Sequence, residues 1–472
     1  MKNIKVKLFT LTLVSVFIGC NSDFGDMNVD PNNPSEALPD LLLSSALTSM
    51  SDVAGAVTGA LYVQYFSETQ YTEDSRYGTE QFSFDYWYST PLNDCQAIID
   101  SESATDNYKA AARITKAYFM HMMTDRWGML PYSEALQGAA NFQPAYDSQE
   151  SIYKGLISDL TEAITLFDAN SSLNGDILFA GDQSRWVQFA NTLRMVMALR
   201  LSGADAAYAQ SEYEKAVTAG VIDSDVMYAH LAEDANASPW YSRFITRTDY
   251  AISNTMDDMM TEKGDLRLLK FADPAPDAEA EGLSGLDLIQ GMTYGISNDA
   301  AGAIQNSAVS FPGAAIRSQD SPLPIYTLAQ VHLSHAEATL HGWSVPGDPA
   351  THYNAGVTAS FEQWWGADGT SAAASYLEQN PYVDLNSIAY EKWVAAFPSG
   401  YEAWAEWRRL DHPELTPAID AQNTSGQIPV RHAYGQTESE LNGANYDAAV
   451  SAQGADDFCL LYTSDAADDT RS

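Results

Sequence analysis

Apolar residues recur at three- and four-residue steps along much of this chain, and that period constrains the fold more than any other feature. In residues 146–167, YDSQESIYKGLISDLTEAITLF, a single face carries Ile152, Leu156, Leu160 and Ile164. A helix that buries one side in a protein core shows this spacing. The sequence therefore predicts an amphipathic α-helix here.

The same period recurs elsewhere, and the start of this helix carries a capping signal. Asp147 precedes Glu150 by three residues, which resembles a capping box. Comparable helical patterns occur at residues 35–50, 105–126, 182–202, 323–342, 351–365 and 401–410. Strand-like alternation is scarce. We therefore expect a mostly α-helical fold in which helix pairs joined by short loops form a repeat scaffold, although no strict 34-residue consensus is visible.

The helical pattern breaks between about residues 222 and 320, where Ala, Gly, Asp and Ser are frequent. Loops of this length in a compact protein are usually functional. With 472 residues and 45% hydrophobic content, the chain can bury one large core or two smaller ones. We expect a loop-rich ligand-binding region set on the helical scaffold.

The N-terminus, residues 1–19, has the three-part layout of an export signal. Lysines come first, an apolar run from Leu8 to Ile18 follows, and the small residue Gly19 comes last. The apolar run is shorter than the roughly 20 residues that a membrane-spanning helix needs. We expect residues 1–19 to be a signal peptide that is removed.

Cys20 follows directly, and Phe17-Ile18-Gly19-Cys20 resembles a bacterial lipobox, whose cysteine is acylated and becomes the mature N-terminus. Acyl chains contribute about 0.8 kcal/mol of membrane affinity for each buried methylene. Cys20 is therefore expected to be a lipid anchor, with residues 20–34 as a polar, flexible tether. The alternative is an ordinary signal with an incidental cysteine.

Charge and cysteine content exclude several classes of partner. The formal net charge is −39, from 63 acidic and 24 basic residues, so nucleic acid and anionic lipid surfaces would be repelled. Besides Cys20, the chain has Cys95 inside a helical pattern and Cys459 in the tail. This leaves no pair for a disulfide and no metal-ligand cysteine spacing.

The C-terminal tail breaks with everything before it. The run from Cys459 to Asp468 looks like the translation of a transposase adaptor used in DNA library preparation. We therefore expect the native sequence to stop near Phe458, and we assign residues 459–472 no structure and no function.

Five stretches carry a resemblance to one family. The segment MTDRWGMLPYSEAL resembles the D-x-W/Y-G-x-x-P-Y-S-E-A signature of the SusD/RagB family of Bacteroidetes surface lipoproteins. Its Gly128 permits a left-handed backbone after a helix, and Pro131 prevents the helix from resuming. The other four stretches follow in the family's order: RWVQFANTLRMVMALRLSG (185–203), PLPIYTLAQVHLSHAEATLHGW (322–343), GYEAWAEWRRLDHPEL (400–415) and IPVRHAYGQTESELNGANYDAAV (428–450).

Two departures accompany the resemblance. The family's Asp-Pro-Arg segment is replaced here by Asp265-Leu266-Arg267, so the geometry of the loop that contains it does not follow from the resemblance. The family's closing aromatic residues are replaced by the suspected adaptor.

The resemblance implies a SusD-like domain over residues 35–458, mostly α-helical, with tetratricopeptide-like helix pairs and no enzymatic activity or cofactor. It implies a lipoprotein at the cell surface of the outer membrane that acts as the lid of a SusC-like TonB-dependent barrel. Such lids capture oligosaccharides, or peptides in some members, and deliver them to the barrel.

Candidate ligand-binding residues are aromatic, because aromatic faces stack on the C–H faces of sugars while their polar tips find hydrogen bonds. The richest stretch is YTEDSRYGTEQFSFDYWYST (71–90), in which Trp87 is the first candidate and Tyr71 and Tyr86 follow. Further candidates lie in the loop-rich region: Trp240, Tyr241 and Arg243 in SPWYSRF, and Tyr294 in GMTYGIS. The alternative is that these rings only pack onto the scaffold.

The tryptophans of the resembling stretches are expected to be core residues, because they lie on helical patterns: Trp127, Trp186, Trp404 and Trp407. Arg408 and Arg409 are expected to pair with Glu402, Glu406 or Asp411 and with the last carbonyls of their own helix rather than with a ligand.

An enzyme or a metal site finds little support in the residues. No G-x-S-x-G elbow, P-loop or dinucleotide-binding motif is present. His332, His335 and Glu337 lie near one another in sequence but lack the H-E-x-x-H spacing. Acidic loops such as residues 223–236 could hold Ca²⁺ only loosely, since they match no EF-hand spacing. A surface glycosidase and an oligopeptide binder are the alternatives to a glycan binder, and the sequence does not fix which glycan would bind.

Overall fold

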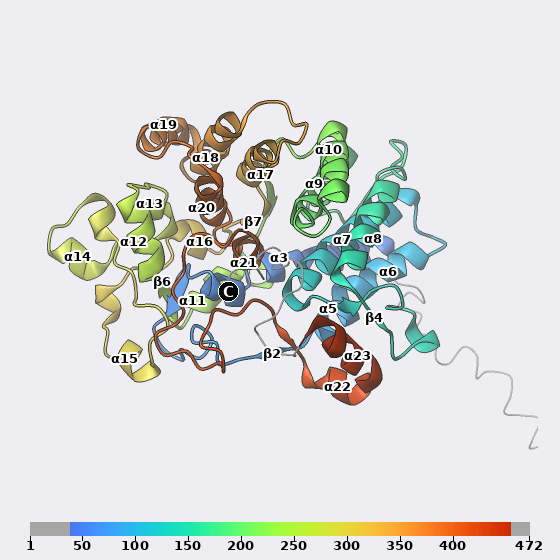
Figure 1. The fold of residues 1–472 in the computed structure, drawn as a ribbon, viewed down its shortest axis with the longest axis horizontal. Coiled ribbons are helices and arrows are strands. Elements are labelled where there is room, and N and C mark those ends of the chain that lie inside the picture. Colours follow the sequence, from blue (N-terminus) through green and yellow to red (C-terminus); the bar gives the residue numbers. More distant parts are fainter. Residues whose placement is uncertain (1–37, 455–472) are drawn as a thin grey trace, which may run out of the picture.

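The computed structural model of the chain describes residues 38–454, and helices dominate it (Figure 1). The N-terminal part contains α2 (Pro39–Thr48), α3 (Met50–Ala54), α4 (Val57–Tyr62), α5 (Asp85–Trp87), the π-helical turn η1 (Tyr88–Leu92) and α6 (Asn93–Asp100). Four longer helices follow: α7 (Asp106–Trp127), α8 (Gln149–Ala163), α9 (Gln183–Arg200) and α10 (Ala206–Ala219).

The helices between residues 222 and 320 are all short, as the composition of this region predicts. These are α11 (Pro239–Phe244), α12 (Asn254–Glu262), α13 (Leu268–Phe271), α14 (Pro276–Ala280), α15 (Asn298–Gly302) and α16 (Ala314–Arg317), with the 3₁₀ turns η3 (Asp234–Asn236), η4 (Gly285–Leu288) and η5 (Asn306–Ala308). They gather on one side of the molecule, opposite α6–α8 (Figure 1).

The C-terminal part returns to longer helices. They are α17 (Leu328–Leu340), α18 (Pro349–Trp365), α19 (Gly369–Gln379), α20 (Leu385–Ala395) and α21 (Gly400–Leu410), followed by the shorter α22 (Gln436–Leu441) and α23 (Gly443–Gln453). Consecutive helices pack in pairs: α7 with α8, α9 with α10, α17 with α18, and α20 with α21. This arrangement confirms the mostly α-helical fold with helix pairs.

Strands in the described part of the chain are two to four residues long and form four two-stranded pairs. The antiparallel pairs are β1 (Phe66–Glu68) with β6 (Tyr250–Ile252), β3 (Leu130–Pro131) with β4 (Tyr146–Asp147), and β5 (Val226–Tyr228) with β7 (Leu323–Tyr326). The parallel pair is β2 (Gln81–Phe82) with β8 (Ala433–Tyr434). Three of the four join segments more than 90 residues apart, so they fasten distant parts of the chain.

Two sequence-based expectations about helix starts are wrong. The cap of α8 is Ser148, whose side chain accepts from the backbone N–H of Ser151. Asp147 instead accepts from the backbone N–H groups of Tyr132 (3.2 Å) and Ser133 (2.8 Å). It therefore fixes the turn of the family signature rather than the helix.

The helix expected over 323–342 is the second correction. Its first four residues form β7, and α17 begins only at Leu328, after a capping box between Thr327 and Gln330. Pro324 has no backbone N–H for a helix, whereas a two-stranded pair tolerates proline.

The apolar segment Pro39–Tyr62 is long and apolar enough by composition to cross a membrane. Here it is divided into α2, α3 and α4, and buried residues such as Leu43, Leu47 and Leu61 belong to the main core. Half of its qualifying 18-residue window is buried, and a core helix passes the same test of length and composition. The free thiol of Cys95 is also buried.

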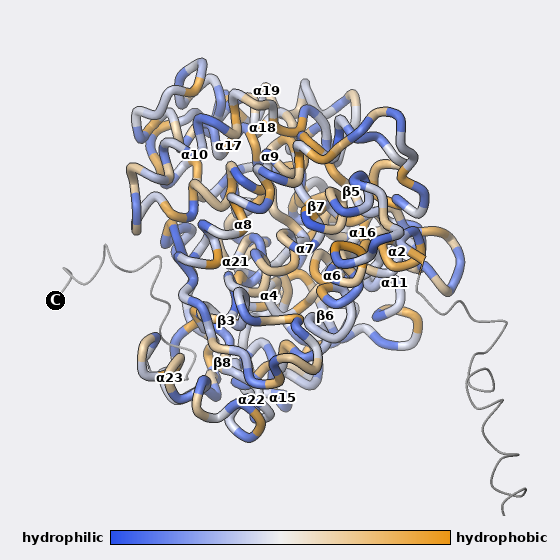
Figure 2. Tube along the Cα trace, turned by 90° about the vertical axis from the view of Figure 1, so that its right-hand side faces the viewer, coloured by the Kyte–Doolittle hydropathy of each residue, from blue (hydrophilic) through white to orange (hydrophobic). Residues whose placement is uncertain are grey.

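The interior is built largely from aromatic and aliphatic side chains of the scaffold helices. Trp127, Trp186 and Trp404 are fully buried, as expected, and Trp407 is half-buried at the edge of the core. Hydrophobic and hydrophilic residues are interspersed along the helices, including α9, α10 and α17 (Figure 2). In α8 the amphipathic period corresponds to burial on one face, which includes Ile152, Leu156 and Leu160, whereas α9 is buried on all sides from Phe189 to Arg200.

The family-signature turn has the geometry that its residues predict. Gly128 ends α7 with φ +77°, a conformation that favours glycine. The amide of Gln453 fills the space beside it, accepting from the N–H of Met129 (2.6 Å) and donating to the carbonyl of Trp127 (3.2 Å). A side chain at position 128 would collide with Gln453.

The altered Asp265-Leu266-Arg267 segment keeps an ordered loop. Arg267 Nη2 lies 2.6 Å from Asp265 Oδ2 and 2.7 Å from Glu391 Oε2 of α20, and all three side chains are buried. Leu266 is partly exposed, so the exchange of the family's proline for leucine at this position alters no buried contact. The loop is therefore fixed by its two charged residues rather than by the residue between them.

Candidate ligand-binding surface

The first predicted site residues lie on the short helix α5. The ring of Tyr86 is 45% exposed, and its hydroxyl donates to Asp52 Oδ2 of α3 (3.0 Å) and lies 3.2 Å from Ser49 Oγ. Trp87 is half-buried, with its ring 5.9 Å from Phe119 and 5.2 Å from Tyr86. Tyr86 therefore offers the larger exposed face, and Trp87 supports it.

The loop-rich candidates Trp240 and Arg243 lie on α11, which is capped by Ser238. Trp240 is fully buried against Phe66, with ring centres 4.6 Å apart. The guanidinium of Arg243 lies 5.0 Å from the centre of the Trp240 ring. Trp240 thus supports this surface from beneath, and the partly buried guanidinium of Arg243 packs against its ring.

Asp52 joins these two groups of residues, although they are about 150 positions apart in the sequence. Burial raises its pKa, while the hydrogen bond from Tyr86 and the charge of Arg243 lower it. Within residues 38–454, Arg243 Nη1 has no hydrogen-bond acceptor. The exposed phenol of Tyr86 and the carboxylate of Asp52 are therefore the groups that could bind the hydroxyls of a ligand directly, while Arg243 Nη1 is a buried donor beside them.

Tyr71 continues this surface at its other end. It is 61% exposed and adopts φ +55°, and its backbone N–H donates to Asn298 Oδ1 (2.6 Å). Arg247, which is paired with Asp249 at 2.6 Å, places its guanidinium 4.7 Å from the centre of the Tyr71 ring. The phenol is therefore held in an exposed position by a loop that is fixed at both sides.

Tyr250 of β6 lies between the two ends. Its ring is 6.3 Å from Trp240, and the charges of Arg243 and Arg247 both act on its phenol. We call the set of Tyr86, Asp52, Arg243, Tyr250, Arg247 and Tyr71, which are linked by the contacts at each end and by the electrostatic influence of the two arginines on Tyr250, the aromatic band. Sequence reasoning missed Asp52, Arg247 and Tyr250, since only the β1–β6 pair and α3 bring them to the other residues.

The remaining two candidates differ in position. Tyr241 is half-buried on α11. Tyr294 is 5% exposed, and its hydroxyl donates to the carbonyl of Leu61 (2.8 Å). It lines a separate pocket of about 360 Å³ together with Gln64 and Glu414. The structure thus brings Tyr71, Tyr86, Trp87, Trp240 and Arg243 together and leaves Tyr294 in a different place.

The two neighbouring arginines of α21 have structural roles. Arg409 Nη2 lies 2.6 Å from Glu406 and 2.7 Å from Glu337. Arg408 donates to the backbone carbonyls of Trp404, Val430 and Asp125. Pairing with Glu406 and with a helix carbonyl was predicted, whereas the bonds to Glu337, Val430 and Asp125 come from segments that the sequence does not place nearby.

The histidine motif does not form a metal centre with Glu337. The carboxylate of Glu337 is paired with Lys392 (2.6 Å) and Arg409, and His335 Nδ1 is bonded to the hydroxyl of Tyr213 (2.8 Å). Within residues 38–454, no three His, Cys, Asp or Glu side chains are placed to hold a metal ion. Calcium binding in the acidic loops stays an untested expectation, and Cys20 and the tail from 459 lie outside the described residues.

A scaffold of helix pairs with exposed aromatic side chains on its surface is typical of a ligand-binding protein. A family model described as starch-binding and associating with the outer membrane matches residues 31–435. The chain therefore belongs to this SusD-like family, which confirms the resemblance read from the sequence.

Solved structures agree with this assignment. A chitin-binding protein has a TM-score of 0.78 and 26% identity, over 90% of this chain and 98% of that one. A SusD homologue of Bacteroides fragilis (TM-score 0.77, 23% identity, 89% and 98% covered) and a chitin-binding SusD homologue of Flavobacterium johnsoniae (0.76, 24%, 88% and 97%) share the fold. A search of curated proteins found no match.

Proposed function

We propose that this protein binds glycan chains at the cell surface through the aromatic band and delivers them to a SusC-like TonB-dependent transporter. The observation that carries the proposal is the convergence of exposed Tyr86 and Tyr71 with Asp52, Arg243 and Arg247 on one surface. Aromatic faces beside carboxylate and guanidinium groups suit a ligand with alternating C–H faces and hydroxyls. The family description, which names starch binding, supports the same class of ligand.

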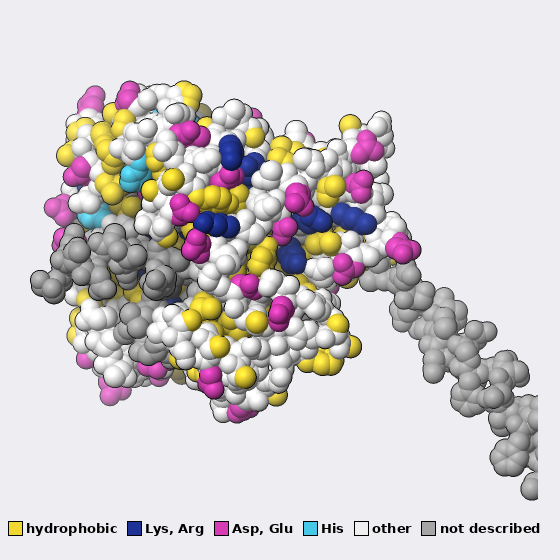
Figure 3. Space-filling view, turned by 45° about the vertical axis from the view of Figure 1, so that its right-hand side comes forward, with side chains coloured by type: hydrophobic (Ala, Val, Ile, Leu, Met, Phe, Trp, Pro, Cys, Tyr) yellow, Lys and Arg dark blue, Asp and Glu magenta, His cyan; other side chains and the backbone are white. Residues whose placement is uncertain are grey.

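Chitin fragments are the first ligands to test, because two of the structural relatives are described as chitin-binding. Acidic side chains are spread over the face shown in Figure 3 rather than gathered at one place. With a net charge of −39, the protein is expected to favour neutral over strongly anionic polysaccharides in long-range attraction.

Titration calorimetry of the chain from residue 21 tests the proposal. The ligands are chitin oligosaccharides, maltooligosaccharides and a peptide digest. We expect heat with one glycan class, and a loss of at least about tenfold in affinity in Trp87→Ala and in Tyr86→Ala, which corresponds to about 1.4 kcal/mol. Phe142→Ala is the control, because Phe142 is 80% exposed and lies outside the band.

Two other results would reject glycan capture. Heat only with the peptide digest would assign the protein to oligopeptide uptake. Release of reducing sugar that stops when one carboxylate is removed would assign it to the glycosidases. Equal loss of affinity in Phe142→Ala would show that the effect does not belong to the aromatic band.

Transporter delivery has its own test. A lid that is permanently associated with its barrel is expected to bury more than about 2,000 Å² of total surface, so the complex should survive gentle extraction. Co-purification of a TonB-dependent barrel with the tagged protein from its native membrane is the expected result. Elution of the protein alone would reject this part of the proposal.

A further inference from the structure

A second pocket of about 300 Å³ lies away from the aromatic band, at the end of α12 and between α18 and α20. The residues that line it and matter for its chemistry are Lys263, Tyr353, Gln379, Asn386, Tyr390 and His412. This volume is at the lower end of the range for small-molecule sites. The pocket could therefore hold one or two sugar rings but not a folded partner.

The wall of the pocket is fixed before any ligand arrives. Asn380, in the loop after α19, donates through Nδ2 to the carbonyl of Lys263 (3.0 Å) and accepts through its own carbonyl from the hydroxyl of Tyr353 (3.1 Å). Asp384 and Ser387 are occupied by the capping box of α20. These bonds preorganise the shape of the pocket, which lowers the entropy cost of binding.

Three polar side chains of the pocket form no hydrogen bond or ion pair with the described part of the chain. Lys263 makes no ion pair within residues 38–454, although its ammonium lies 4.6 Å from the centre of the Tyr390 ring. In the same part of the chain, the side chains of Asn386 and His412 form no hydrogen bond. A preformed pocket that collects an ammonium, an amide and an imidazole suits a ligand with several acceptor oxygens.

Lys263 differs from two other lysines of the interior and its edge, which are bound by carboxylates. Lys392 is bound by Glu337 and Glu406 at 2.6 and 2.8 Å, and Lys154 by Glu150 and Asp205 at 2.7 and 2.8 Å. Several lysines in residues 38–454 lack a carboxylate partner, among them Lys109, Lys116 and Lys270, but of these lysines Lys263 is the one that lines this pocket. Lysine with tyrosine, amide and imidazole groups is a combination that binds sugar oxygens.

We propose that this pocket is a second sugar-binding site, in which Lys263 donates to an acceptor oxygen on one sugar unit, such as an acetamide carbonyl or a uronate carboxylate. Asn386 and His412 would bind ring hydroxyls at the same unit. This inference rests on the proposed glycan-binding function, and it adds a site that does not overlap the aromatic band.

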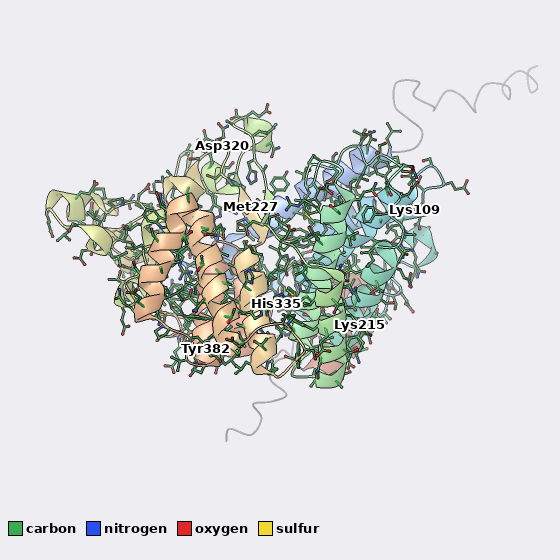
Figure 4. The ribbon with its side chains drawn as sticks, turned by 90° about the horizontal axis from the view of Figure 1, so that it is seen from above. Lys109, Lys215, Met227, Asp320, His335 and Tyr382 are labelled. Atoms are coloured by element: carbon green, nitrogen blue, oxygen red, sulfur yellow. The ribbon has the colours of Figure 1, made fainter. Side chains whose placement is uncertain are left out.

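The two sites lie in different parts of the molecule. Tyr382 belongs to the loop beside the pocket and is found at the lower edge of Figure 4. Asp320 and Met227 are in the upper part of that view. Both residues have neighbours in the chain that lie beside the aromatic band. The carbonyl of Gln319, next to Asp320, accepts from the backbone N–H of Ser238, which caps α11. Burial raises the pKa of Tyr228, next to Met227, and the charge of Asp52 adds to this rise. A short oligosaccharide therefore occupies one site or the other, and each site fills independently.

Calorimetric stoichiometry with trisaccharides tests the second site. The probes are tri-N-acetylglucosamine, maltotriose and trigalacturonate, which differ in the acceptor that they present to Lys263. We expect the unmodified chain to bind two equivalents of one probe. Lys263→Met and Asn386→Ala should each reduce this to one equivalent, and Trp87→Ala should leave one equivalent that the further change Lys263→Met removes.

Lys270→Met is the matched control, because Lys270 also places its ammonium over an aromatic ring, 4.2 Å from the centre of Trp365, but outside the pocket. It should keep both equivalents. Binding of one equivalent that Lys263→Met and Asn386→Ala leave unchanged would overturn the second site and preserve the proposed function. Silence with all glycans would overturn both. A crystal soaked with the bound trisaccharide should show the sugar beside Lys263, and density only at Tyr86 would also overturn the inference.

Discussion

The helical scaffold and the loop-rich region from residue 222 to 320 stabilise their interiors by different means. In the scaffold, charged side chains from separate helices meet inside the protein. Lys392 of α20 lies 2.6 Å from Glu337 of α17 and 2.8 Å from Glu406 of α21, and Arg200 of α9 lies 2.6 Å from Glu402. Each of these carboxylates is buried, so each depends on its partners.

The loop-rich region relies mainly on backbone hydrogen bonds between distant segments. The N–H of Met292 donates to the carbonyl of Ile252 (2.8 Å), and the N–H of Ile252 donates to the carbonyl of Ser310 (2.9 Å). A small hydrophobic cluster beneath them includes Ala251 and Val309. This difference suggests that long helices need side-chain pairs to fix their mutual positions, whereas irregular chain is fixed by its own backbone groups.

Arg267 connects the two kinds of interior. It belongs to the loop-rich region by sequence, yet its guanidinium binds Glu391 of α20 (2.7 Å) and Ser360 of α18 (2.9 Å). The aromatic band lies where α11 and β6 of the loop-rich region meet the N-terminal helices. Ligand-binding groups thus occur where short, locally fixed segments contact a rigid support.

Removing a buried carboxylate from the scaffold should have the largest effect on stability. In Glu337→Ala, Lys392 and Arg409 lose a shared partner inside the protein. We expect the free energy of unfolding to fall by about 3–5 kcal/mol, since two buried cations are then left to share the single carboxylate of Glu406. Urea denaturation followed by circular dichroism measures this change.

An exposed ion pair on the same scaffold provides the control. Arg113 and Glu162 are 3.4 Å apart, and the side chain of Glu162 is 68% exposed. Because solvent screens such pairs, Arg113→Ala should cost less than about 1 kcal/mol. A cost for Glu337→Ala no greater than that of Arg113→Ala would show that the buried network does not stabilise the scaffold.

The β1–β6 pair, which joins the N-terminal part of the chain to the loop-rich region, should respond to pH. Glu68 faces Tyr250 across this pair, and burial raises its pKa from the ordinary 4.5 to about 8, despite two hydrogen bonds from Ser75. The folded state thus keeps a proton that the unfolded chain releases above about pH 4.5. The contribution of Glu68 to stability is therefore fully present below that pH and is lost as the pH rises toward 8.

The slope of this loss is at most one proton, or about 1.4 kcal/mol for each pH unit. Chemical denaturation at intervals between pH 5 and 8 measures the slope, and Glu68→Gln should flatten it because the amide does not titrate. An identical slope in the unmodified protein and in Glu68→Gln would assign the pH dependence to other groups.

Helix content could be predicted from the sequence because the amphipathic period is a local property. The stretches around α7, α8, α9, α18 and α21 were placed to within a few residues. Errors arose where tertiary pairing competed with that period: residues 323–326 pair with β5 and form a strand. The helices α10, α19 and α20 were not singled out, and buried Glu391 and Lys392 make the inward face of α20 look polar.

The binding surface was predictable only in part. The exposure of Tyr71 and Tyr86 could be predicted, because their stretch lacks a helical period. The grouping of α5 with α11 could not be predicted, because it depends on Asp52 in an otherwise apolar segment. Likewise, no pattern distinguishes buried Trp240 from half-buried Trp87. The pocket beside Lys263 gave no signal in the sequence, since its residues come from four separate segments.

The smallest effect is expected at a helix end, where the scaffold depends on its own backbone groups as the loop-rich region does. Ser148 Oγ accepts from the N–H of Ser151 at the start of α8 (3.1 Å). Ser148→Ala should lower the free energy of unfolding by about 1 kcal/mol, and Ser148→Asp should retain most of the stability, because aspartate is also a good cap. Thermal denaturation of both variants checks this. Equal loss in the two would mean that the bond of Ser148 Oγ to Ser151 Oγ, rather than the cap, holds the start of α8.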